Sequence, residues 1–118
     1  MIDEVLKRLL SDLAGARCVL LASHDGMVVA AAVAADGPAP GVVAASLADL
    51  FGKVGMAHRE AGLARPREFT SGGSTVCAVL RAVTPQYLLV AVLDGIGGLG
   101  KTRFELRKAA ARLEPELT

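Results

Sequence analysis

The sequence predicts one α+β domain in which a five-stranded antiparallel sheet lies between helices on both faces. The chain has 118 residues, the length of one ordinary domain, and 53% of them are hydrophobic, which is enough for a core. Apolar runs too short for helices are separated by turn signals, so successive strands must be antiparallel. Stretches with helical spacing stand at both ends and in the middle. We therefore expect residues 1–118 to form a single domain.

The first half of the chain predicts a helix, a hairpin and a second helix. Apolar residues recur at helical spacing from Ile2 to Leu13, and Gly15 follows as a stop signal. Residues 17–23 and 27–34 are predicted strands, because the His24-Asp25-Gly26 sequence between them favours a tight turn. A loop rich in Gly and Pro then leads into one long helix, from residue 42 to about residue 62.

The second half predicts three strands and a closing helix. Residues 67–71 are short and rather polar, as an edge strand should be, and two glycines turn the chain into a strand at 74–82. A turn at 83–86 precedes an almost wholly apolar strand at 87–93, and residues 101–113 have helical spacing. The first and last helices are expected on one face of the sheet and the long central helix on the other.

Charge and composition restrict the partners. Thirteen basic residues against twelve acidic ones give a net charge of +1, without the basic excess that nucleic-acid binding usually requires. Charges among the first eight residues interrupt any signal-peptide core, and no apolar run approaches membrane-spanning length. Cys18 and Cys77 lie in apolar runs without metal-ligand spacing. We expect a cytoplasmic protein with no membrane partner, two reduced buried thiols, and no metal or cofactor.

The central helix has two apolar faces. One stripe is assigned to the domain's own sheet: Val43, Leu47, Leu50, Val54 and Ala61. A stripe of small residues beside it suits close approach by the same helix of a second copy, and the polar edge strand could pair with its symmetry mate. The dimer interface is therefore predicted to comprise Ala44, Ala45, Ala48, Phe51, Gly52, Gly55 and Phe69. The alternative is a monomer whose helix is Ala-rich because Ala favours helices.

Residues 95–102, GIGGLGKT, match the phosphate-binding pattern GxxxxGK[ST] after a predicted strand and before a predicted helix. In such a loop Lys101 would contact phosphates and Thr102 would hold magnesium. The preceding strand is reached through tight hairpins, however, and only sixteen residues follow Thr102. We therefore interpret this segment as a flexible turn and keep nucleotide binding as a remote alternative.

Two smaller clusters also need an interpretation. Ser23, His24 and Asp25 are adjacent, and adjacent side chains cannot converge into a nucleophilic triad, so they indicate a turn. Arginines gather around the end of the central helix and the next strand, where one could act on a GTPase's transferring phosphate. Solvated charge beside an edge strand is the favoured interpretation of these residues, which are Arg59, Arg65 and Arg67. No catalytic residue is predicted, so we expect no enzyme.

The pattern resembles the roadblock (dynein light chain 7) family, and within it the bacterial MglB-like proteins. Residues 15–30, GARCVLLASHDGMVVA, and 98–110, GLGKTRFELRKAA, carry the resemblance, and the element order agrees over essentially the whole chain. The resemblance implies a roadblock/profilin-like fold that dimerises through its central helix and edge strand. It also implies a Ras-like small GTPase as partner, bound on the paired central helices. MglB-like members stimulate GTP hydrolysis without an arginine finger, and other roadblock proteins only scaffold.

The function expected from this resemblance is a non-enzymatic homodimer that activates or otherwise partners a Ras-like small GTPase. A non-catalytic dimeric scaffold in a signalling complex is the alternative. The polar strip of the central helix is the part left uncovered once the sheet and a second copy are packed. The GTPase contacts are accordingly predicted at this strip and near its end, by Asp49, Lys53, Arg59 and Glu60.

Overall fold

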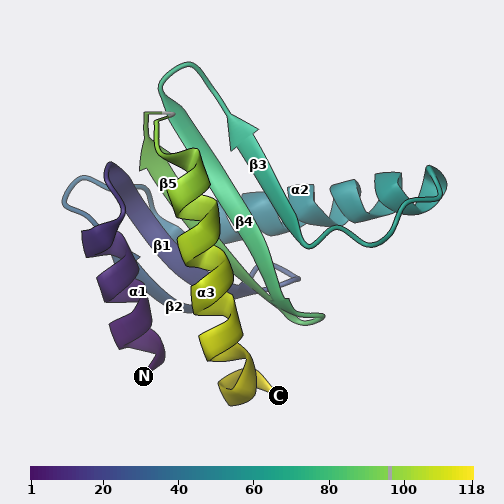
Figure 1. The fold of residues 1–118 in the computed structure, drawn as a ribbon, viewed down its shortest axis with the longest axis horizontal. Helices are drawn as coiled ribbons and strands as arrows, with labels where there is room; N and C mark the ends of the chain where they lie inside the picture. Colours follow the sequence, from purple (N-terminus) through teal and green to yellow (C-terminus); the bar gives the residue numbers. More distant parts are fainter. Residues whose placement is uncertain (96) are drawn as a thin grey trace.

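The computed structural model, which describes residues 1–95 and 97–118, has a five-stranded sheet between two layers of helices (Figure 1). Helices α1 and α3 lie side by side on one face, and α2 crosses the other face. The order along the chain is the predicted one. The elements are α1 (Ile2–Asp12), β1 (Ala16–Ser23), β2 (Val28–Val33), α2 (Pro40–Glu60), β3 (Glu68–Gly72), β4 (Val76–Thr84), β5 (Tyr87–Asp94) and α3 (Leu99–Leu117).

The sheet has the strand order β2-β1-β5-β4-β3, and all pairs described are antiparallel. Three strands, β1, β5 and β4, lie inside the sheet, and β1 and β5 are almost continuous apolar runs, as expected of strands that helices cover on both faces. In their ladder Leu20 lies opposite Val90 and Leu21 opposite Leu89, and all four are buried. The two edges are β2 and the short β3.

Each face of the sheet has its own apolar core. Under α1 and α3 lie alternate residues of β1, β4 and β5, such as Val19, Val79 and Ala91, which pack against Leu6 and Leu106 of the helices. On the α2 face lie the residues between them, such as Leu20, Leu80 and Val90. This alternation follows from the two-residue period of a strand. The core on the α2 face contains few large side chains from the helix itself.

Helix α2 covers only part of its face. Its N-terminal half packs over β1 and β2, and its C-terminal half extends past β3 before residues 61–67 return to the sheet (Figure 1). We call residues 52–60 the overhang and residues 61–67 the return segment. Most side chains of the overhang are exposed or half-exposed, because they have no sheet beneath them.

Two helix boundaries differ from prediction. Helix α2 begins at Pro40 rather than residue 42, since proline is well suited to the first turn of a helix. Helix α3 begins at Leu99 and continues to Leu117, whereas residues 101–113 were predicted. Gly98 adopts a left-handed conformation (φ +77°) immediately before the helix, so the turn is completed earlier than the spacing indicated. Pro115 lies inside the last turn of α3.

Candidate functional site

The face of α2 that packs on the sheet is not the one predicted. Ala44, Ala48 and Phe51, predicted for the dimer interface, are 1%, 3% and 5% exposed and belong to the core on this face, so in a single chain they face the sheet. The small alanines let the helix approach the sheet closely. Phe51 fills the widening space where the helix leaves it. The helix is thus rotated, and these three residues are interior within a single chain.

The stripe predicted to cover the sheet lies on a flank of the helix instead. Val43, Leu47, Leu50 and Val54 are only half-buried, and Ala61, beyond the helix end, is exposed. Val43 and Leu47 line a groove of about 480 Å³ between α2 and the β3–β4 hairpin. We call the side of α2 formed by Val43, Leu47, Leu50 and Val54 the apolar flank. An apolar helix face that one chain leaves half-covered is the kind of surface that a partner buries.

The remaining residues predicted for the interface lie elsewhere. Ala45 and Gly52 are on the opposite flank of α2, and Gly55, four residues after Phe51, continues the sheet-facing side into the overhang; a Cβ added to either glycine would meet no atom within 4 Å. Ala45 faces the β1–β2 turn, where a Cβ on Gly26 would come within 3.0 Å of the Ala45 Cα atom. Phe69 is half-buried on the α2 face of the edge strand β3, beside the core.

Three of the four predicted GTPase contacts, Asp49, Lys53 and Glu60, lie on the outer side of α2, and Arg59 is exposed but lines a hollow described below. Asp49 and Lys53 are 68% and 71% exposed and form an ion pair of 3.0 Å along the helix. Arg59 and Glu60 are exposed at the end of the overhang. Such a pair contributes little to stability, about 0.3–0.5 kcal/mol. Asp49, Lys53 and Glu60 therefore form a polar outer surface of α2 that is accessible in the single chain.

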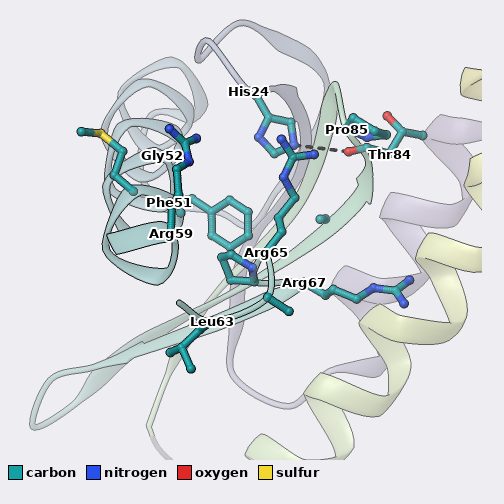
Figure 2. Close-up of a pocket in the computed structure, with 14 residues that line it drawn as sticks. His24, Phe51, Gly52, Arg59, Leu63, Arg65, Arg67, Thr84 and Pro85 are labelled. Carbon is teal, nitrogen blue, oxygen red and sulfur yellow. Dashed lines mark hydrogen bonds between the residues drawn. The ribbon is translucent and has the colours of Figure 1, made fainter. Parts of the chain in front are cut away.

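A second hollow, which we call the arginine pocket, has a volume of about 850 Å³. It lies between the overhang, the return segment and the β1–β2 and β4–β5 turns. Figure 2 shows the Phe51 ring directed toward its middle. Arg59 and Arg65 extend toward the side occupied by His24, whereas the Arg67 guanidinium points away toward α3. The sequence predicted an arginine cluster here, but gave no sign that two of its members share a concave surface.

His24 lies at the rim of this pocket. Its Nε2 atom is 3.3 Å from the Thr84 carbonyl oxygen, and its ring centroid lies 5.9 Å from that of Phe51. Partial burial, together with the positive charge of Arg65, lowers the pKa of His24. The imidazole is therefore mostly neutral near pH 7. Ser23 meanwhile donates a hydrogen bond to Asp25 and not to His24, which agrees with a turn rather than a catalytic triad.

The phosphate-loop match does not have the geometry of a phosphate site. Strand β5 is antiparallel to both neighbours, whereas a phosphate loop follows a parallel strand. Thr102 is 3% exposed and packs into the core, so its hydroxyl group cannot reach a metal ion in solvent. Lys101 is exposed. Ile96, within the matching segment, lies outside the described residues.

The described residues contain no group of three His, Cys, Asp or Glu side chains that could hold a metal ion. Cys18 and Cys77 are free and buried, as predicted, and burial raises the pKa of both thiols. No helix among the residues described is both long and apolar enough to cross a membrane.

Solved structures resemble this chain over nearly its whole length. One, described as MglB with a tetrameric arrangement, is 28% identical with a TM-score of 0.84, covering 95% of this chain and 84% of that one. Myxococcus xanthus MglB is 22% identical with a TM-score of 0.88, covering 98% and 94%. A roadblock/LC7 domain from Streptomyces avermitilis is 15% identical with a TM-score of 0.87, covering 98% and 96%.

The chain has the roadblock/LC7 fold. No protein-family model matches the sequence, and no curated protein matches it either. The likeness therefore comes from the arrangement of three helices on a five-stranded antiparallel sheet, which is the predicted roadblock/profilin-like architecture.

Proposed function

We propose that this chain is an MglB-like homodimer that regulates a Ras-like small GTPase without being an enzyme itself. The observation that supports this most is the likeness to MglB at 28% identity and a TM-score of 0.84 over 95% of the chain. The GTPase is the partner implied by the family resemblance of residues 15–30 and 98–110. A nucleotide-binding role is disfavoured, because Thr102 is buried and β5 is antiparallel.

The dimer would form on the apolar flank rather than on the small-residue stripe. The return segment lies beside Gly55 and Arg59 of the overhang, whereas Val43, Leu47, Leu50 and Val54 are apolar and half-exposed, which favours their side for a partner helix. A twofold axis beside β3 would carry each overhang onto the groove of the other copy. Edge strands β3, each with a half-buried Phe69, would then meet.

The GTPase would bind the outer surface of the paired α2 helices. With the sheet below and the partner helix alongside, the side chains left facing solvent include Asp49, Lys53 and Glu60, with Arg59 at the end. Both charge signs are present, which suits specific recognition rather than attraction of any anionic surface. A regulator must bind the GTP and GDP states with different affinity, because a ligand shifts a two-state element only by its differential binding.

The test is the affinity of the unmodified dimer for a cognate Ras-like GTPase, sought first among neighbouring genes, in its GTP-like and GDP states. We expect tighter binding of the GTP-like state and about tenfold weaker binding of Lys53→Glu, since a charge in the contact is reversed. Lys7→Glu on α1 is the matched control and should bind normally. Equal affinity for both states would indicate a scaffold. Loss of binding in Lys7→Glu alone would place the GTPase on the α1/α3 face.

A further inference from the structure

The arginine pocket combines positive charge with an apolar wall. Arg59 comes from the overhang and Arg65 from the return segment, and in Figure 2 both extend toward the side occupied by His24. Within residues 1–95 and 97–118 neither guanidinium has a carboxylate within ion-pair distance, and no lining residue is acidic. Two like charges directed to one side repel each other, so an anion between them would be stabilised by both.

The wall beneath these arginines is apolar and partly open. Phe51 lies at its centre, and Leu63, 59% exposed, lies across from it on the return segment. Pro66 and Pro85 line the same space. Covering the exposed Leu63 side chain with an apolar group would be favourable, by about 25 cal/mol per Å² of apolar area buried. The pocket therefore offers a binding surface for an apolar body next to its charge.

Two glycines keep the pocket empty. Gly52 and Gly55 line it from the overhang, and a Cβ added to either would enter open space. Each glycine inside a helix costs about 1 kcal/mol of stability relative to alanine. A volume of about 850 Å³ is within the range of pockets that hold small molecules. None of the residues Val43, Leu47, Leu50 and Val54 lines the pocket, so a partner helix packed on them would leave it open.

We propose that the arginine pocket binds a small amphipathic anion, with a phosphate or carboxylate group between Arg59 and Arg65 and an apolar or aromatic body against Phe51 and Leu63. This site does not depend on the proposed GTPase partner. An acidic peptide segment offers similar charge, but a hollow of this size enclosed on three sides by one chain favours a compact ligand over an extended one.

The unmodified protein is titrated with 2-naphthyl phosphate, which carries both the anionic group and the aromatic body, while the NMR chemical shifts of the backbone amides are followed. Inorganic phosphate supplies the anionic group alone, and 2-naphthol supplies the aromatic body alone. We expect 2-naphthyl phosphate to bind at least about tenfold more tightly than either, with shifts confined to residues lining the pocket. Equal affinity for inorganic phosphate would reveal an adventitious ion only. Equal affinity for 2-naphthol, shifts elsewhere, or binding only of an acidic peptide would overturn the proposal.

Three variants locate the contacts. Arg65→Ala should weaken binding of 2-naphthyl phosphate about tenfold or more, because the protein then lacks a charged hydrogen-bond donor to the phosphate. Arg67→Ala is its matched control. It also removes one positive charge, two residues along the chain, but the Arg67 guanidinium points toward α3 and away from the pocket. Gly55→Leu should abolish binding by filling the space while the helix remains folded. Equal losses in Arg65→Ala and Arg67→Ala, or unchanged binding in folded Gly55→Leu, would contradict the site.

Discussion

The two halves of helix α2 differ in how much of their surface is buried. In the N-terminal half, Ala44 and Ala48 lie against the sheet and are almost fully covered. In the overhang, Met56 is 55% exposed, and neither Gly52 nor Gly55 would bring an added Cβ within 4 Å of another atom. The first half is therefore held by the domain itself. The second half lies beyond the sheet edge, where the return segment of the same chain is its neighbour and its other sides are open to a partner.

The largest effect is expected from Ala48→Glu in the packed half. A carboxylate placed against Leu20 and Val90 would be buried without a partner, which costs several kcal/mol. We expect the domain to lose most of its folded population rather than to become a folded monomer. Ala57→Glu, the same substitution at an exposed overhang position, should change the free energy of unfolding by about 0.5 kcal/mol or less. Chemical denaturation of both variants measures the difference; a fully stable Ala48→Glu protein would contradict this packing.

A smaller effect, on association alone, is expected from Val54→Glu on the apolar flank. Val54 is half-exposed in the single chain, so a charge there remains solvated until a second copy covers it. We expect the dimer dissociation constant to rise about 100-fold, equivalent to about 2.7 kcal/mol, while the circular dichroism of the chain is unchanged. If the variant dimerises normally, the apolar flank is not the interface.

The smallest effect is expected from Gly52→Ala in the overhang. The added Cβ meets nothing, so the substitution should stabilise the chain by about 0.5–1 kcal/mol through helix propensity. Dimerisation should be unaffected, because Gly52 lies on the flank with the arginine pocket. Weaker dimerisation of this variant would instead place Gly52 at a close helix contact. Thermal unfolding and sedimentation of the same sample distinguish the two results.

The fold could be predicted because its signals are local. Short apolar runs predict the strands, and the tight turns between them, such as His24 to Gly26, require neighbouring strands to be antiparallel. The orientation of α2 could not be predicted in the same way. The helix is apolar or small around much of its surface, so its pattern fits two rotations, and Ala44 with Phe51 rather than Val43 with Leu47 faces the sheet. The choice depends on how closely the backbone approaches β1, which is a tertiary property.

The candidate site likewise has one part that the sequence predicted and one part that it did not. Exposure of Asp49 and Lys53 followed from their spacing on the helix, because polar residues at one angle on the helix face solvent. The arginine pocket did not, since Arg59 and Arg65 line one hollow only because the return segment folds back beside the overhang. Neither helical nor strand periodicity encodes the path of such a connection.

We infer that a second copy of the chain packs against the overhang. Sedimentation equilibrium of the unmodified protein at micromolar concentration tests it most directly, with hydrogen exchange over residues 52–60 recorded on the same material. We predict the mass of two chains, with amide protection in the overhang that falls on dilution as the dimer dissociates. A mass of one chain throughout this concentration range, with exchange in residues 52–60 independent of dilution, would contradict the account.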